Sequence, residues 1–244
     1  MTASLYSALA FFVFLNGIVW LWYRRREDRW VRRVARSAVE MRRALYTEIP
    51  VLRRLNDGEL LEKRRALDAP ARAMPGFRVL ADYVDVYPPG SRFEKHARDP
   101  IRVLVDEAGR TVALIFLAKG SVRVHLATEL DGPRWVLTEN NRNVTRAVRP
   151  PSFDVLRVVV ETSPAEMIAA HRERVTPARG DREPSPIRAF DDFVASHERR
   201  WDAIRAHRKQ VGWALPEEIV LPRKTSPNQR DRILAEVRRL LAET

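Results

Sequence analysis

The chain has 244 residues, of which 45% are hydrophobic and 31% charged, a composition typical of a folded protein rather than a disordered one. It contains no cysteine, which excludes disulfides, thiolate zinc sites and cysteine nucleophiles. The net charge is +12, and residues 24–76 alone hold fifteen basic and eight acidic residues, a net of +7. A basic excess placed just after an apolar N-terminus favours membrane-flanking cations over a surface that binds nucleic acid.

The first 23 residues carry no charged side chain and predict a transmembrane anchor, with residues 4–23 as the span. About 20 helical residues cross a hydrocarbon layer of about 30 Å. Arg24, Arg25 and Arg26 follow, so the positive-inside rule predicts an N-terminus outside and a cytoplasmic C-terminal domain, at the inner or plasma membrane. A cleaved signal peptide is the competing interpretation, but it needs its basic residues before the apolar run.

Asn16 lies inside this predicted span. An amide in hydrocarbon is satisfied best by another helix, so Asn16 is a candidate contact with a partner protein or with a second copy of the chain. The alternative is a polar residue that a single-pass helix tolerates without pairing. Membrane lipids are predicted partners in both cases.

Apolar residues then recur at three- and four-residue steps from Trp30 to Leu45, which predicts one continuous helix to about Thr47. Its opposite face is basic and suits anionic lipid head groups, with a solvated helix face as the alternative. The arginines assigned to the membrane surface are Arg24, Arg25, Arg26, Arg29, Arg32 and Arg33. A short further helix is predicted at 59–67, and a linker at 68–76.

Beyond residue 76 the hydrophobic pattern changes from a helical period to alternation. Six strands are predicted, at residues 77–87, 101–106, 111–118, 121–130, 134–139 and 155–161. The short connections between them contain glycine, which predicts consecutive antiparallel hairpins and hence a meander.

Three helices are predicted after the sheet. Ser163 and Ser226 each begin a capping box with proline at the first helical position, and Ser185 begins the longest of the three helices. The predicted fold class is α+β, an antiparallel sheet of about six strands with helices before and after it. The predicted domains are a transmembrane anchor at 1–23, a basic juxtamembrane helical neck and linker at 24–76, an antiparallel α+β domain at 77–175, and a C-terminal helical region at 176–244 that packs on the sheet domain.

The sequence has no phosphate-binding loop, dinucleotide-binding fingerprint, nucleophile elbow or His-Glu-x-x-His motif, and no catalytic residue, cofactor or metal is predicted. One arrangement indicates a site: in a meander, the long polar loops 88–100 and 140–154 lie at the same end of the sheet. Binding sites are common on such loops, and arginine suits phosphate and carboxylate. The candidate anion-binding residues are Arg92, Lys95, His96, Asn140, Asn141, Arg142, Arg146 and Arg149.

An arginine-biased surface with two ordinary loops is the alternative to such a site. The favoured function is a non-enzymatic, membrane-tethered binding or scaffold module that recognises an anionic ligand or lipid head group through these loops. The second is a membrane-associated enzyme acting on a lipid or other anionic substrate, with His96 as the candidate general base. A nucleic-acid binder is disfavoured, because residues 77–161 are nearly neutral and lack interleaved aromatic and basic residues.

Overall fold

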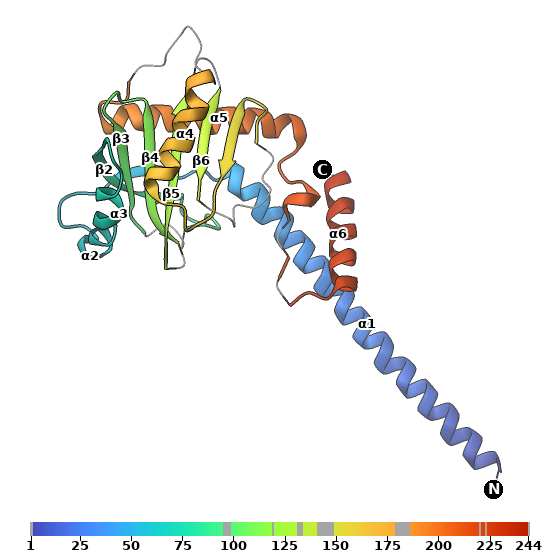
Figure 1. The fold of residues 1–244 in the computed structure, drawn as a ribbon. Coiled ribbons are helices and arrows are strands. Elements are labelled where there is room, and N and C mark those ends of the chain that lie inside the picture. The colour runs from blue at the N-terminus through green and yellow to red at the C-terminus, as the bar shows by residue number, and fades with distance from the viewer. Residues whose placement is uncertain are drawn as a thin grey trace. The chain divides into compact units, whose positions relative to one another are not determined.

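A computed structural model shows a mixed α+β protein with a seven-stranded sheet and several helices (Figure 1), which confirms the predicted class. The structure describes the backbone of every residue except 1, 95–98, 119, 131–133, 141–148, 179–185, 220, 223 and 244, and the side chains of residues 2–17 are also outside the description. The strands are β1 (Val51–Arg54), β2 (Phe77–Val86), β3 (Ile101–Asp106), β4 (Thr111–Ala118), β5 (Ser121–Glu129), β6 (Trp135–Glu139) and β7 (Phe153–Arg157). The helices are α1 (Thr2–Thr47), α2 (Leu61–Arg65), α3 (Asp68–Arg72), α4 (Pro164–Ala178), α5 (Phe190–Val211), the 3-10 turn η1 (Pro216–Glu218) and α6 (Pro227–Ala242).

The chain divides into two compact units. Residues 44–213 form the sheet unit, and residues 1–43 together with 214–244 form the α1–α6 unit. Each is described by itself below.

The sheet runs in the order β1 to β7, so neighbours in sequence are neighbours in space. The pairs from β2–β3 to β5–β6 are antiparallel, as predicted, but β6 and β7 are parallel, so the prediction of a fully antiparallel meander was wrong. A parallel pair needs a connection of about a dozen residues or more, and residues 140–152 supply one. The connection therefore begins at the end of the sheet predicted for the site and returns to the other end.

The predictions also missed β1, which has four residues and is mostly exposed. It lies in the segment that was predicted to be helical neck, directly after Pro50, where the pattern is too short to distinguish a strand from a turn. Its pairing with β2 adds a seventh strand to the six that were predicted.

Both faces of the sheet are covered by helices (Figure 1). On one face, Leu104 and Leu126 pack with Met167 of α4 and with Leu67, next to α3. On the other face, two clusters of strand residues pack against Phe193 and Ile204 of α5. A sheet buried on both faces has room for polar side chains only where they are paired or functional.

In the α1–α6 unit, one face of α1 packs against α6. Val31 and Ala35 of α1 and Ile233 and Val237 of α6 form its buried core. The helix α1 ends at Thr47, as predicted. Among the residues whose side chains are described, no helix is long and apolar enough to cross a membrane; most of the predicted span 4–23 lies outside those residues.

Two of the three predicted helix starts are confirmed. Ser226 Oγ accepts from the Gln229 main-chain N–H at 3.3 Å, and α6 begins at Pro227, while α4 begins at Pro164 after the corresponding Ser163 box. The prediction for α5 was wrong, because this helix begins at Phe190 rather than after Ser185. The Asp192 carboxylate accepts from the main-chain N–H groups of residues 188 and 189, each at 2.8 Å, and so caps the later start.

Candidate functional site

A row of polar side chains crosses three neighbouring strands on the α5 side of the sheet. In the strand register, His125 of β5 lies opposite Glu139 of β6, and Glu139 lies opposite Arg157 of β7. Side chains two residues apart on a strand lie on the same face. Ala127 and Leu137, each two residues away along the strand, pack with α5. The polar row therefore faces α5.

Two further arginines lie beside this row. Arg123, on the same face of β5, donates from Nη1 to the main-chain carbonyl of Asn140 at 3.1 Å. Arg149, from the connection between β6 and β7, donates from Nη2 to Glu139 Oε1 at 3.4 Å. The second oxygen of this carboxylate lies 4.0 Å from Arg157 Nε. Glu139 is thus the acid that Arg149 and Arg157 share.

Arg200 reaches the same region from α5. Its guanidinium lies 5.9 Å from the centre of the Trp135 ring, and its Nη2 lies 3.0 Å from Nδ1 of His197. The charges of Arg149 and Glu139 are close enough to influence the pKa of Arg200, yet no carboxylate among the described residues lies within 4.0 Å of its guanidinium. The arginine cluster, as we call it, consists of Arg123, His125, Glu139, Arg149, Arg157 and Arg200.

The arginine cluster has three positive charges in excess at neutral pH. Its four arginines face one glutamate, and burial lowers the pKa of His125 to about 4, so the ring is neutral. Burial is also the main cause that lowers the pKa of Arg200; Arg149 adds to this effect, and Glu139 opposes it only in part. A lowered arginine pKa marks a charge that its surroundings do not fully compensate.

Four buried polar atoms of the cluster have no hydrogen-bond partner among the described residues. They are Arg123 Nε, His125 Nε2, Glu139 Oε2 and Arg149 Nε, four of the seven such side-chain atoms in that part of the chain. Arg123 is 7% exposed and Glu139 is 4% exposed. An unpaired buried donor or acceptor costs about 1–3 kcal/mol, so native proteins keep few of them and concentrate them where they have a use.

A further acidic group with a shifted pKa, Asp85, lies at the end of β2. Burial raises the pKa of the Asp85 carboxyl to about 6. Asp85 in turn contributes to the raised pKa of Tyr87, whose ring lies 5.3 Å from that of Phe93 in the loop after β2. Glu48 Oε2 accepts from the Arg92 main-chain N–H at 3.0 Å and holds the start of this loop.

Two of the predicted anion-binding residues, Arg149 and Asn140, lie at the cluster, and five of the other six are outside the described residues. Arg149 is a member of the cluster, and the side chain of Arg92 is exposed on the other loop. Asn140 is 3% exposed; its Oδ1 accepts from the Val124 main-chain N–H at 2.7 Å, so it positions Arg123 rather than facing a ligand. The remaining predicted residues are outside the described part of the chain: Lys95, His96, Asn141, Arg142 and Arg146.

Sequence reasoning missed the other five members of the cluster. A signal for two of them was present: Val122, Val124 and Leu126 alternate with Arg123 and His125, so one face of a buried strand had to carry polar groups. No signal in the sequence could have assigned Arg200, because only the packing of α5 on the sheet places it by the Trp135 ring, within range of the charge of Glu139.

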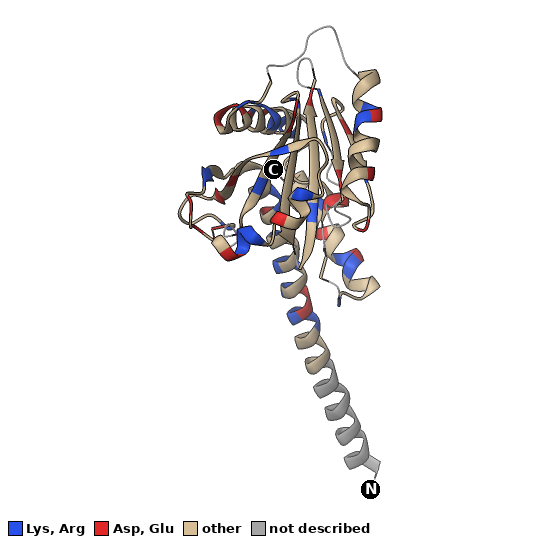
Figure 2. Cartoon of the chain, turned by 60° about the vertical axis from the view of Figure 1, so that its left-hand side comes forward, with Lys and Arg blue, Asp and Glu red and all other residues tan. Residues whose placement is uncertain are grey.

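The arginines assigned to the membrane surface are all exposed on α1, at positions 24, 25, 26, 29, 32 and 33. Figure 2 shows the basic residues along this helix as blue bands. Arg24 lies over the ring of Trp20 at 5.0 Å, and Arg26 lies over the ring of Trp22 at 5.4 Å. The first arginines of the basic segment therefore lie against exposed aromatic rings of the same helix.

Comparison with known proteins gives no relative from which a function can be transferred. No family model, curated protein or solved structure matches the chain. The chemistry of the arginine cluster is therefore the basis for assigning a function.

Proposed function

We propose that the protein is a single-pass, membrane-anchored binding module whose sheet unit binds a small oxyanion, a phosphate or a carboxylate group, at the arginine cluster. The observation that carries the proposal is a cluster of four arginines with a single glutamate, in which the buried Nε donors of Arg123 and Arg149 have no hydrogen-bond partner among the described residues. Guanidinium groups donate in a planar fork that matches phosphate and carboxylate oxygens. An anion at this place would accept from the free donors and reduce the excess charge.

A second arginine network lies on the opposite face of the sheet, and its contacts are those expected of a purely structural network. Arg102 donates from Nε and Nη2 to the two oxygens of Asp82, at 2.8 and 3.0 Å, and Arg64 donates to the same carboxylate at 2.7 Å. Arg102 also donates to Asp68. This network has two arginines and two aspartates, and none of its atoms is among the unpaired ones.

The arginine cluster differs from that network in both charge balance and pairing. Burial of charges that are not compensated is costly, so a structural role alone favours matched pairs. The cluster has an excess of cations and has donors without partners among the described residues, which suits an anion that comes from solution. Two of its arginines are accessible to such an anion: the side chain of Arg149 is 22% exposed and that of Arg157 is 35% exposed. The module therefore binds the ligand from the side on which these two side chains are accessible.

The anchor and its orientation are part of the same proposal. Residues 1–23 carry no charge, and the backbone of α1 is helical from Thr2, past Arg24, to Thr47. Twenty such residues span about 30 Å, the thickness of a bilayer core. Trp20, Trp22 and Tyr23 are more than half exposed at the end of this stretch, where membrane proteins place aromatic rings. The arginines that follow favour a cytoplasmic sheet unit.

Calorimetric titration of the full chain in detergent micelles with inorganic phosphate tests the anion site. Sodium chloride at the same ionic strength is the reference, because screening alone affects both salts equally. Phosphate binds to the native chain, and Arg149→Gln and Arg157→Gln each weaken it about tenfold or more, the effect of one charge-assisted hydrogen bond of about 1.5–3 kcal/mol.

Arg53→Gln is the matched control, because this exposed arginine of β1 is paired with Glu59 at 3.0 Å and lies outside the cluster. It leaves phosphate affinity unchanged. Equal affinity in all four proteins, or equal heats with phosphate and chloride, would show that the cluster is only a charged part of the core.

A further inference from the structure

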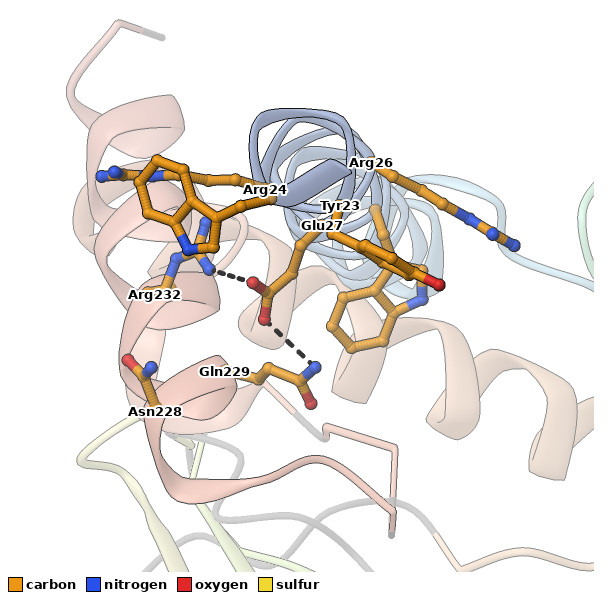
Figure 3. Close-up of a pocket in the computed structure, with 9 residues that line it drawn as sticks. Tyr23, Arg24, Arg26, Glu27, Asn228, Gln229 and Arg232 are labelled. Carbon is orange, nitrogen blue, oxygen red and sulfur yellow. Dashed lines mark hydrogen bonds and ion pairs between the residues drawn. The ribbon is translucent and has the colours of Figure 1, made fainter. Parts of the chain in front are cut away.

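A groove in the α1–α6 unit lies between the N-terminal part of α1 and the first turn of α6 (Figure 3), with a volume of about 760 Å³. Three aromatic side chains of α1 line it: Trp20, Tyr23 and Trp30. Trp20 is 57% exposed and Tyr23 is 60% exposed, although both belong to a helix whose next turns pack against α6. The groove thus combines an open apolar wall with a rigid helix pair.

Cations surround the groove. Its lining includes Arg24 and Arg26 of α1 and Arg232 of α6. Arg24 and Arg26 extend to opposite sides of α1 (Figure 3). Among the described residues, their guanidinium groups contact the aromatic rings of Trp20 and Trp22 rather than carboxylates, so their charges are available to an anion.

Among the described residues that line the groove, Glu27 is the only acid. Its carboxylate points toward α6, where it accepts from Gln229 Nε2 at 3.2 Å and pairs with Arg232 Nη1 at 2.8 Å (Figure 3). Arg232 also pairs with Asp28. These contacts hold the first turn of α6 against α1, and the positive end of the α6 dipole adds to the potential of the arginines.

We infer that this groove binds the head group of an anionic phospholipid, with its phosphate between Arg24 and Arg232 and its glycerol against the aromatic wall. The inference rests on the anchor that we propose, because the groove begins at Trp20 and therefore lies at the depth where a span of residues 4–23 leaves the bilayer. Aromatic rings and basic residues at this depth are the groups that contact lipid head groups. The basic face of α1 attracts anionic lipid head groups in general, and the groove adds a defined binding site for one head group, formed by α1 and α6 together.

Native mass spectrometry of the full chain in micelles tests the site, with phosphatidylglycerol and phosphatidylcholine of identical acyl chains as probes. The native chain retains phosphatidylglycerol in preference to phosphatidylcholine. Arg232→Gln lowers the retention of phosphatidylglycerol about tenfold, since it removes a phosphate-facing cation. Glu27→Gln raises it roughly threefold, because it removes the only acid of the lining.

The two variants separate lipid binding from loosening of the helix pair. Both lose the same Glu27–Arg232 ion pair, so a structural effect alone would shift both in the same direction. Arg230→Gln is the control, an exposed arginine of α6 outside the groove, and leaves the retention unchanged. Shifts of equal sign in the first two variants, a loss of equal size in the control, or equal retention of the two lipids would overturn the inference.

The micelle supplies the lipid, so this measurement does not depend on insertion of the chain into a bilayer. Failure of the anchor itself would instead appear as native protein in the soluble fraction of lysed cells. Failure of the anion site would appear in the phosphate titration, where Arg232 has no part.

Discussion

The two arginine networks on opposite faces of the sheet should respond in opposite ways to the loss of one arginine. Arg102→Met leaves Asp82, which is 5% exposed, with only one of its two cationic partners. Burial alone would raise the pKa of Asp82, and the bonds from Arg102 and Arg64 outweigh it and bring the pKa below its usual range. Removing one partner of a buried pair costs about 3–5 kcal/mol.

Arg200→Met removes a half-buried charge that no described carboxylate pairs directly. The loss is one hydrogen bond to His197 and the contact with the Trp135 ring, and the gain is relief from desolvation of the guanidinium. These effects are each about 1 kcal/mol and of opposite sign. The expected stability of Arg200→Met is therefore equal to or above that of the native chain, while phosphate binding is lost.

Thermal unfolding of the full chain in one detergent, followed by near-ultraviolet circular dichroism, measures both variants. A change of 1 kcal/mol shifts the midpoint by about 2–4 °C in a protein of this size. Arg102→Met should therefore lower the midpoint by roughly 6–20 °C, whereas Arg200→Met should leave it unchanged or raise it by less than about 3 °C. A drop in Arg200→Met as large as that in Arg102→Met would refute the distinction between a structural network and a binding cluster.

Three further outcomes are expected. Asp85→Asn should stabilise the chain at pH 7.5 by up to about 3 kcal/mol. The pKa of Asp85 is about 6 in the folded chain and about 3.9 in the unfolded chain, so the native carboxyl lowers stability as the pH rises from about 3.9 to about 6. In denaturant titrations near pH 3.5 the gain should vanish. Gly109→Ala should destabilise the chain by about 2–4 kcal/mol, because the φ of Gly109 is +71° and an added Cβ would lie 2.9 Å from the Ile187 carbonyl oxygen. Gly58→Ala, where the Cβ meets no atom within 4 Å, should cost only about 1–2 kcal/mol. Alkaline carbonate should leave the chain in the membrane pellet, and protease outside intact cells should leave residues 27–244 uncut; digestion of the sheet unit there would reverse the proposed orientation.

Much of the sheet was predictable because alternation and short turns are local signals. The strands from Phe77 to Glu139 follow from period-two burial, and the starts of α4 and α6 follow from Ser-Pro capping boxes. The parallel pairing of β7 was not predictable from these signals, because residues 140–152 allow either a long hairpin or a crossover. In the structure the parallel arrangement brings the Phe153 ring against Trp135, a tertiary contact that neither segment encodes locally.

The candidate site was predictable only in part, for a related reason. Loop composition pointed to Arg149, and the structure places it on Glu139. Glu139 itself ends an apolar strand, and Arg200 lies sixty residues further on in a helix whose sequence resembles any amphipathic surface helix. Their proximity depends on which face of α5 meets which end of the sheet, and this information is not local to either segment.

The most direct test of the anion site observes the Nε–H groups of Arg123 and Arg149, for which the described residues supply no hydrogen-bond partner. In full-length chain labelled with ¹⁵N-arginine in micelles, the Nε–H resonances are assigned through Arg123→Lys, Arg149→Lys and Arg102→Lys. Phosphate, but not chloride at equal ionic strength, should shift the resonances of Arg123 and Arg149 and leave that of Arg102 in place, because Arg102 Nε is already bound to Asp82. Unmoved Arg123 and Arg149 resonances at saturating phosphate, or equal movement of all three, would contradict an oxyanion site at the arginine cluster.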